Sequence, residues 1–426
     1  PIAERADILN YLQEVIADNQ LQEKILYQHK GLSASWDSKL QNWLVQCQHQ
    51  ETGEQKVFRC NFLWMCQGYY DHAKGYTPDF AGMDDFQGSI VHPQTWPDDL
   101  DYTDKKIIVI GSGATAATLI PNLSEKAQHV TMLQRSPTYF FTGENRNELA
   151  DRLRDLDIPP EWLHEILRRD ILKLQQEVQT LSAQHPEMVK QELLSVIRQF
   201  LGEDADIEKH FTPSYRPWQQ RLAYVPDGDL FKAIASGQAS VVTDGIERFV
   251  EQGIQLQSGS ILEADIIITA TGFNVLPLGG MQFSVDGKAI DLHNHVTYRG
   301  ILFSDIPNMS QMFGYFRTSW TMRVDLVADF ICNLLKHMDS LGTGSVTPVL
   351  TPEEQAMERL PWVEEEVFNS GYIKRSMHLF AHQLAQAPWK FNYDYYTERD
   401  ELPAVDLDET ALVYAPRTLS SSRSGT

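Results

Sequence analysis

A chain of 426 residues, of which 42% are hydrophobic, is long enough to bury the cores of two or three domains. Its 36 lysines and arginines stand against 58 aspartates and glutamates, so the net charge of −22 argues against a nucleic-acid partner and against an anionic membrane surface. Because no apolar run approaches the roughly 18 residues of a membrane span, the composition favours a soluble cytoplasmic protein without an integral membrane segment.

The chain has four cysteines, which are Cys47, Cys60, Cys66 and Cys332. They form no CxxC pair, and none has a histidine nearby at zinc-ligand spacing. We therefore expect reduced and mostly buried thiols, with neither a disulfide framework nor a metal site.

A helical pattern begins almost at the first residue, through Ile8, Leu12 and Ile16. Because this pattern follows so soon after Pro1, we expect that a further part of the protein precedes it. Apolar segments separated by polar turns come next and predict strands of a small antiparallel layer. These segments are residues 31–36, 43–47 and 58–66.

A strand, a glycine-rich turn, a helix and a second strand then follow in the order of a βαβ unit. The strands are predicted at residues 105–110 and 129–134. In the turn, Gly111 permits a tight bend, Gly113 lets the backbone approach a pyrophosphate, and the helix N-terminus supplies amide donors. The flanking strand and helix favour a dinucleotide site over a plain turn. The candidate binding residues are Gly111, Ser112, Gly113, Ala114, Thr115, Ala116 and Ala117.

The second strand of this unit ends in Gln134, Arg135 and Ser136, where a fold selective for NAD would carry an acidic residue. An arginine at this place suits the 2′-phosphate of NADP, so we assign Arg135 and Ser136 to NADP binding. The alternative is that Arg135 is an ordinary solvated surface arginine.

Apolar residues recur at helical spacing from Glu148 to about Leu201, and they predict an inserted helical subdomain that serves packing. Alternating β-type segments return from Val241 to Phe273, and the serine-rich end of the chain predicts disorder. The expected divisions are residues 1–100, 101–147, 148–205 (the insertion), 206–273, 274–416 and 417–426 (the disordered tail).

A connection rich in glycine, aspartate and proline runs from residue 68 to about residue 102, and its length suggests a function. It contains the string FQGSIVHPQTWP, which resembles the FxGxxxHxxxW(P/D) fingerprint of Baeyer–Villiger monooxygenases. A terminal tryptophan favours this family over the flavin monooxygenases that oxygenate nitrogen and sulfur. We assign His92 a linker role that couples domain movements, with direct proton transfer as the alternative. The fingerprint residues are Phe86, Gly88, His92, Trp96 and Pro97.

A third constellation is FTPSYRPWQQRLAYVPDGD, in which Arg221 follows Trp218. By the resemblance, Arg221 aligns with the active-site arginine of the family, which stabilises the anionic oxygenating form of the flavin. A guanidinium suits this task because it stays charged without titrating. The alternative is a surface ion pair with Asp227 or Asp229. Gln220 stands where many relatives carry a lysine.

The resemblance covers nearly the whole chain and is greatest for the ethionamide-activating branch. It implies an α/β fold of two dinucleotide-binding, Rossmann-like domains with a helical insertion. The FAD domain would be incomplete at its N-terminus. By the resemblance, Gly31, Gly68 and Tyr69 lie at the FAD, whereas Thr271 and Gly272 close the NADP domain onto the FAD domain.

The predicted function is therefore that of an NADPH- and FAD-dependent monooxygenase. It inserts one oxygen atom of O2 into a ketone, giving an ester or lactone, or adds it to a sulfide. Two alternatives remain at this point. One is a monooxygenase that oxygenates nitrogen or sulfur, and the other is a non-catalytic NADP-binding remnant, because a GxGxxG turn for FAD is not found in the sequence.

Overall fold

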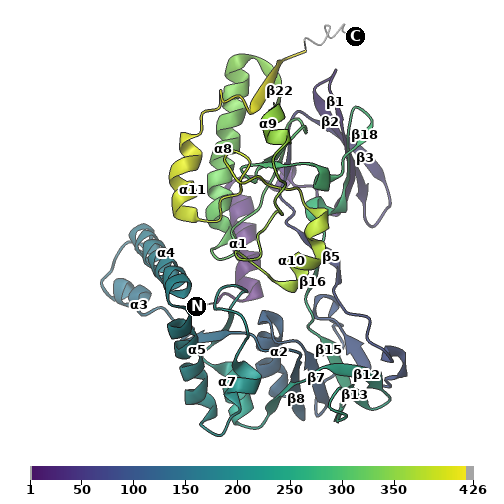
Figure 1. The fold of residues 1–426 in the computed structure, drawn as a ribbon, viewed down its shortest axis with the longest axis vertical. Helices are drawn as coiled ribbons and strands as arrows, with labels where there is room; N and C mark the ends of the chain where they lie inside the picture. The colour runs from purple at the N-terminus through teal and green to yellow at the C-terminus, as the bar shows by residue number, and fades with distance from the viewer. Residues whose placement is uncertain (1, 419–426) are drawn as a thin grey trace. The chain divides into compact units, whose positions relative to one another are not determined.

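The computed structural model describes residues 2–418, so most of the tail that is predicted to be disordered, residues 419–426, lies outside the described part of the chain. Two compact units make up the chain (Figure 1). Unit 1 comprises Pro1–Leu12 and His72–Asn274, and unit 2 comprises Gln13–Asp71 and Val275–Thr426. The chain passes between them in α1 (Arg5–Asp18), in β5 (Tyr70–Gly75) and in β16 (Phe273–Val275). Strands β5 and β16 pair with each other.

Unit 1 is built on a five-stranded parallel sheet. Its strands and those around it are β6 (Ser89–Val91), β7 (Lys106–Ile110), β8 (His129–Gln134), β9 (Phe140–Gly143), β10 (Ala223–Pro226), β11 (Ala239–Thr243), β12 (Ile246–Val250), β13 (Gly253–Leu256), β14 (Ile261–Glu263) and β15 (Ile266–Thr269). The order in the sheet is β11-β8-β7-β15-β6. The predicted βαβ unit is confirmed, because β7 and β8 pair in parallel as its two strands.

Both faces of this sheet are covered, which explains why its central strands are continuous apolar runs. On β7, Ile107 and Val109 belong to the core on the helical face, whereas Ile108 and Ile110 belong to the core beneath the small antiparallel sheet β12-β13-β14. All four are buried. The alternation of side chains along a strand thus divides one hydrophobic run between two cores.

The helices that cover one face of the parallel sheet are α2 (Ala114–Ser124), α5 (Pro186–Leu201), α6 (Ile207–Phe211) and α7 (Asp229–Ala235) (Figure 1). Two further helices of unit 1, α3 (Glu148–Asp155) and α4 (Pro160–Gln184), contribute no residue to that core. The predicted helical segment after Glu148 is confirmed as α3, α4 and α5. Its assignment to packing is wrong for α4, which buries only Ser182 and leaves Trp162 and Leu174 62% and 58% exposed.

The long connection after residue 68 is more structured than the sequence indicates. Besides β5 it contains β6, which joins the edge of the parallel sheet next to β15, and two short 3₁₀ helices, η2 (Met83–Asp85) and η3 (Pro93–Thr95). Only three residues of β6 pair with β15, so the strand is too short to produce a recognisable alternation.

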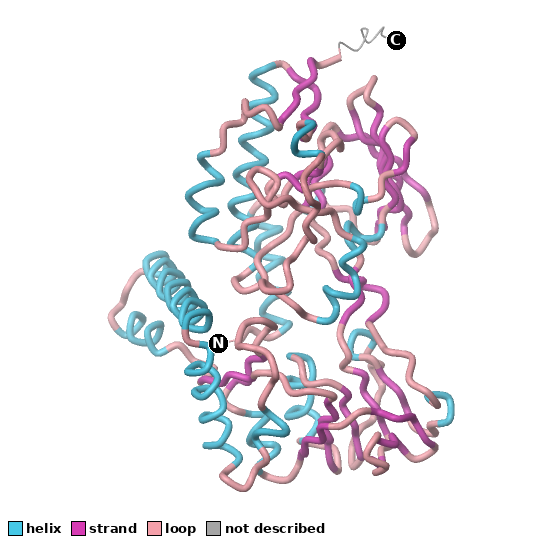
Figure 2. Tube along the Cα trace, viewed as in Figure 1, coloured by secondary structure: helices cyan, strands magenta, loops and turns pink. Residues whose placement is uncertain are grey.

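Unit 2 contains two larger sheets (Figure 2, magenta). Its strands are β1 (His29–Asp37), β2 (Asn42–His49), β3 (Gln55–Cys60), β4 (Leu63–Met65), β17 (Gln282–Val285), β18 (Lys288–Ala289), β19 (Thr297–Tyr298), β20 (Leu302–Phe303), β21 (Met309–Gln311), β22 (Thr343–Pro348) and β23 (Leu412–Pro416). The antiparallel layer β1-β2-β3 is confirmed. The expected strand 58–66 is wrong: residues 61–62 interrupt it, and β4 pairs with β21 in the other sheet.

The helices of unit 2 are η1 (Gln22–Lys24), η4 (Pro277–Gly280), η5 (Leu292–Asn294), α8 (Trp320–Leu341), α9 (Pro352–Gln355), α10 (Gly371–Ser376), η6 (Met377–Leu379), α11 (Tyr395–Glu401) and η7 (Leu402–Ala404). The longest of them is α8, and two of the others, α11 and η7, pack against it. Arg323 on α8 is fully buried and makes a bidentate ion pair with Glu398 on α11. Its Nη1 and Nη2 groups also donate to the carbonyl oxygens of Phe313 and Arg299, so protein groups pair the charge and accept most of its hydrogen bonds.

The cysteines follow the prediction only in part. All four are free thiols, but Cys66 and Cys332 are exposed, so the expectation of mostly buried thiols is wrong for these two. Burial raises the pKa of Cys47 and Cys60. Throughout residues 2–418, no group of histidine, cysteine and carboxylate side chains is arranged to hold a metal ion. None of the helices in that range is long and apolar enough to cross a membrane.

Candidate dinucleotide site and its surroundings

The glycine-rich turn lies at the carboxyl end of β7, where open α/β sheets bind their ligands. Gly111 has φ of 128°, and a Cβ atom there would lie 2.4 Å from the carbonyl oxygen of Ala270. Its amide donates to the carbonyl of Leu133 on β8. Only glycine fits this position, because the backbone conformation and the close approach of the next strand both exclude a side chain.

Gly113 differs from Gly111, because it faces open space. No heavy atom of the described chain lies within 4 Å of a Cβ atom built on it, and both Gly113 and Ala114 are exposed. Gly113 caps α2, and among the described residues no side chain caps this helix end. Ala116 and Ala117, at 0% and 2% exposure, pack the helix against the sheet. The free amides and the helix dipole at this end are therefore available to an anionic group.

The end of the neighbouring strand β8 presents an arginine beside the turn. Arg135 and Ser136 are exposed, and in the part of the chain that the structure describes Arg135 has no hydrogen bond or ion pair. The residue before them, Gln134, is only 2% exposed and donates to the carbonyl of His210 and the hydroxyl of Thr243. Gln134 thus anchors the strand end through its hydrogen bonds, whereas Arg135 is exposed.

His92 of the fingerprint contacts both segments that lead out of unit 1, which are β5 and the residues just before β16. Its Nδ1 accepts a hydrogen bond from the amide of Gln94, which makes Nε2 the protonated nitrogen of a neutral ring. Nε2 then donates to the carbonyl of Gly272, just before β16. The ring also fills the space over Gly75 in β5, where a Cβ atom would lie 1.8 Å from Cε1. His92 thus links β5 to the segment before β16, and this link is called the joint below.

The other fingerprint residues attach this joint to unit 1. Phe86 is buried in the core beneath β12-β13-β14, and a Cβ atom on Gly88 would lie 2.2 Å from the carbonyl oxygen of Asp265. Trp96 packs on the helical core, and the carbonyl of Pro97 accepts from Leu100. In this structure the fingerprint residues thus lie at a core contact, at a close backbone approach and at the hydrogen bonds of His92.

Thr271 belongs to the same joint. Its hydroxyl donates to the carbonyl of Tyr76 at 2.6 Å, and the amide of Tyr76 donates to the carbonyl of Gly272. Gly272 has φ of 106°, so it also needs glycine. No sequence pattern singles out Gly75 or Tyr76 within the loop, because each contributes through a neighbour that is distant along the chain.

Arg221 lies in unit 1 on the loop before β10 and is exposed. Within residues 2–418 it forms no ion pair with Asp227 or Asp229, so the surface-pair alternative has no support. Asp227 instead accepts from the amide of Asn145. Burial raises the pKa of Asp229, the opposite of the direction that an arginine partner would impose.

Three predicted FAD residues, Gly31, Gly68 and Tyr69, lie in unit 2. Gly68 has φ of 76° and open space around a built Cβ atom, whereas one on Gly31 would meet the sulfur of Met281 at 2.7 Å. Tyr69 is 4% exposed, stacks on Trp320, and shares its hydroxyl with those of Tyr70 and Tyr372. Burial, together with these neighbouring hydroxyls, raises its pKa far above the usual range.

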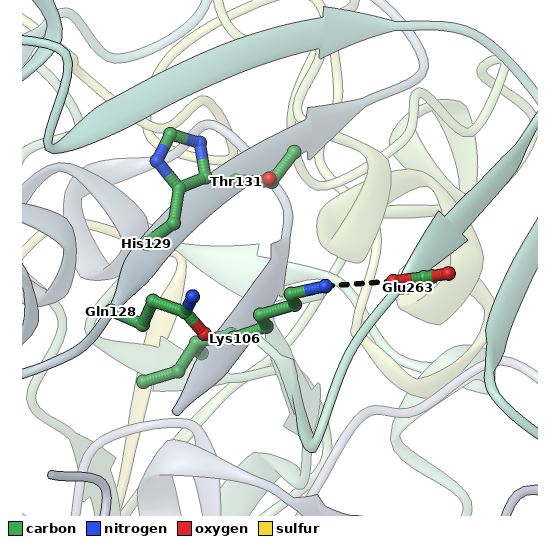
Figure 3. Close-up of a pocket in the computed structure, with 6 residues that line it drawn as sticks. Lys106, Gln128, His129, Thr131 and Glu263 are labelled. Carbon is green, nitrogen blue, oxygen red and sulfur yellow. Dashed lines mark hydrogen bonds and ion pairs between the residues drawn. The ribbon is translucent and has the colours of Figure 1, made fainter. Parts of the chain in front are cut away.

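A shallow pocket of about 270 Å³ lies at the amino-terminal ends of the strands of the parallel sheet, opposite the glycine turn (Figure 3). Lys106 and His129, the first residues of β7 and β8, line it, and Lys106 is paired with Glu263. Since the glycine turn follows the last residue of β7, this pocket is separate from the dinucleotide site.

Comparison with known proteins agrees with a two-unit, dinucleotide-binding α/β protein. Residues 2–153 match the model of the family described as flavin-binding monooxygenase-like. The chain is 43% identical over 417 residues to the probable FAD-binding monooxygenase AlmA of an Acinetobacter species, covering 98% of this chain and 82% of that protein. It is 42% identical over 417 residues to the FAD-containing monooxygenase EthA of Mycobacterium tuberculosis, covering 98% and 84%.

Solved structures agree with these sequence relatives. An oxidized steroid monooxygenase bound to NADP superimposes with a TM-score of 0.74 at 20% identity, covering 97% of this chain and 85% of that one. The predicted α/β fold is thereby confirmed. The chain belongs to the flavin-binding monooxygenase family, and within it to class B, the Baeyer–Villiger type, so it is a flavin-dependent monooxygenase.

Proposed function

We propose that this chain uses NADPH and FAD to transfer one oxygen atom of O2 to a small organic substrate. The substrate is a ketone, which becomes an ester or lactone, or a sulfide, which becomes a sulfoxide. The observation that carries the proposal is the open glycine turn at Gly113 with the unpaired Arg135 beside it. The names of the relatives support it, since they are FAD-binding or FAD-containing monooxygenases.

The residues of unit 1 fit NADP. The free amides at the start of α2 would hold the pyrophosphate, while Arg135 and Ser136 would hold the 2′-phosphate. In unit 2, the open space at Gly68 and the buried Tyr69 would line part of the FAD site. We extend this to the domains: residues 101–147 and 206–273 form the NADP domain, and residues 1–100 and 274–416 belong to the FAD domain and its linker.

The reaction consumes NADPH, a proton, O2 and the ketone, and it yields NADP⁺, water and the ester. When bound, FAD supplies the activation of oxygen. The chain supplies position and charge. Arg221 offers a guanidinium group that no carboxylate in the described chain pairs with, so it can stabilise an anion during oxygen transfer. His92 holds the joint between β5 and β16 and takes no proton in this scheme.

The test uses the purified full-length protein, with its bound flavin measured by absorbance. NADPH, isotopically labelled O2 and either a cyclic ketone or a thioether are added, and the products are analysed by mass spectrometry. We expect one labelled oxygen atom per product molecule, with NADPH consumed in proportion. A cyclic ketone that yields a labelled lactone distinguishes the Baeyer–Villiger reaction from oxygenation restricted to nitrogen or sulfur.

Two results would contradict the proposal. A protein that binds NADP⁺ but neither holds flavin nor consumes O2 would be the non-catalytic remnant. A protein that oxidises NADPH and releases only hydrogen peroxide, with every ketone and sulfide unchanged, would be an oxidase.

A further inference from the structure

A hydroxyl pair ties the glycine turn to the segment that follows β8. Ser112, in the middle of the turn, is 8% exposed, and its hydroxyl lies 2.9 Å from that of Thr138. The hydroxyl of Ser112 also donates to the carbonyl of Ser136 at 3.4 Å. In that arrangement Thr138 is the donor of the hydroxyl pair, because Ser112 has only one hydroxyl proton. A shift of the turn therefore moves Thr138.

The loop that carries Arg221 rests on the residues next to Thr138 at both of its ends. At its start, the ring of Tyr215 packs edge-on against Tyr139, with centroids 5.5 Å apart. At its end, the amide of Ala223 donates to the carbonyl of Tyr139 at 2.9 Å, and β10 pairs with β9 from Ala223 and Phe140 onward. The loop from Tyr215 to Ala223, here called the arginine loop, thus has one common support.

The contact at the start of the arginine loop is incomplete. The Tyr215 hydroxyl lies beside the hydroxyl of Thr138 and the amide of Tyr139, whose dipoles lower its pKa, although burial outweighs them and raises it. Yet in the described residues no hydrogen bond of ordinary geometry reaches this hydroxyl, which is buried. A buried hydroxyl without a partner costs free energy, so the contacts at the start of the arginine loop do not fully stabilise it.

The middle of the arginine loop also contains an unfavourable backbone conformation and an unpaired polar atom. Trp218 has φ of 64°, a left-handed conformation that is unfavourable for a bulky residue, and among residues 2–418 its buried indole nitrogen has no acceptor. The loop therefore has two uncompensated groups, Tyr215 and Trp218, and a change at its support can shift it between arrangements.

We propose that Thr138 is a positioning residue that transmits occupancy of the glycine turn to Arg221. A pyrophosphate bound at Gly113 fixes Ser112, Ser112 fixes Thr138 through the hydroxyl pair, and Thr138 fixes both ends of the arginine loop. The loop then holds Arg221 in one place only when the dinucleotide is bound. This inference rests on the proposed function for its ligand, NADP, and it gives roles to Thr138 and Tyr215, which the sequence alone does not single out.

The test compares Thr138→Val, which keeps the shape and removes the hydroxyl, with Thr138→Ser, which keeps the hydroxyl. Amide hydrogen exchange is followed in peptides covering residues 215–223, with and without NADP⁺, in the full-length protein. In the wild type and in Thr138→Ser, NADP⁺ should slow exchange in these peptides. In Thr138→Val, NADP⁺ should still bind, weakened by no more than about tenfold for one lost hydrogen bond, but the slowing of exchange should disappear.

The second readout is the yield of oxygenated product per NADPH consumed, which should fall in Thr138→Val and recover in Thr138→Ser. Tyr215→Phe should resemble Thr138→Val, since it removes the other hydroxyl. If NADP⁺ slows exchange in residues 215–223 equally in all variants, or in none of them although it binds, the inference is wrong. If the exchange pattern appears but no protein oxygenates any substrate, the inference stands and the proposed function fails.

Discussion

Three arginines of this protein differ in their burial and in their partners. Arg323 in unit 2 is completely buried, and its guanidinium contacts Glu398, two carbonyl oxygens and the face of Phe391. Arg135 and Arg221 in unit 1 are exposed, and the described residues provide neither with an ion pair. The protein itself pairs Arg323, whereas Arg135 and Arg221, to which we assign ligands in the proposed function, have no ion-pair partner among the described residues. Substitution should therefore affect stability in one case and chemistry in the other.

The largest effect is expected for Arg323→Ala, which leaves the buried carboxylate of Glu398 without a partner. Removing one partner of a buried ion pair costs about 3–5 kcal/mol, so the variant should unfold at much lower urea concentration. The matched control is Arg399→Ala, because Arg399 pairs with Asp400 on the surface, where such pairs contribute under about 1 kcal/mol. Equal shifts in the two variants would show that the buried network is not what stabilises unit 2.

Arg221→Ala should lower the rate of oxygen transfer without changing the stability of the fold. Loss of one fixed charge at a developing anion lowers the rate about a hundred- to a thousandfold, so ester formation should fall by that factor while the urea midpoint stays the same. The control is Arg198→Ala, which removes another arginine from unit 1. Because Arg198 is paired with Glu208, its loss should leave the rate of ester formation unchanged. Ester formation at the wild-type rate in Arg221→Ala would remove Arg221 from the site.

Arg135→Ala should weaken only the binding of one cofactor. A charge-assisted hydrogen bond contributes about 1.5–3 kcal/mol, so the KM for NADPH should rise about ten- to a hundredfold. The KM for NADH should change little, because NADH has no 2′-phosphate. Parallel losses with NADPH and NADH would place Arg135 among the structural arginines instead.

The smallest effect is expected for His210, whose protonation changes the stability of the fold with pH. Burial, with a smaller contribution from Lys209, lowers the pKa of His210 below its usual 6.5, and its ring bonds the hydroxyl of Thr243. Below pH 6.5 the unfolded chain therefore binds a proton that the folded chain does not, and stability falls as the pH falls through this value. His210→Gln should reduce this acid sensitivity of the urea midpoint. An unchanged pH profile would assign the sensitivity to other groups.

The local elements were predictable because their signals are local. The apolar run before Gly111 predicts β7, the glycine spacing predicts the turn, and the recurring leucines predict α4. The joint at His92 was predictable only as a linker, since its contacts to Gly75 and Gly272 depend on two strands that converge from distant parts of the chain.

Thr138 and Tyr215 could not have been found from the sequence. Thr138 meets Ser112 across 26 positions of the chain, through a hydroxyl pair that no periodicity reports. The pairing of β1 with β17 was missed for the same reason, because the strands are about 250 positions apart and both are short amphipathic segments. Long-range pairs depend on topology, which the pattern of single segments does not determine.

The pairing of β1 with β17 also has a consequence for the order in which the protein matures on the ribosome. All residues of unit 1 have been synthesised once Asn274 is added, so its parallel sheet can form while translation continues. The layer around β1 has to wait for β17, and β22 has to wait for β23 near the end of the described chain. During this interval β1, β2 and β3 have an unpaired edge that can associate with other nascent chains. Unit 1 is thus expected to mature first, and crowded or slow translation should harm unit 2 more.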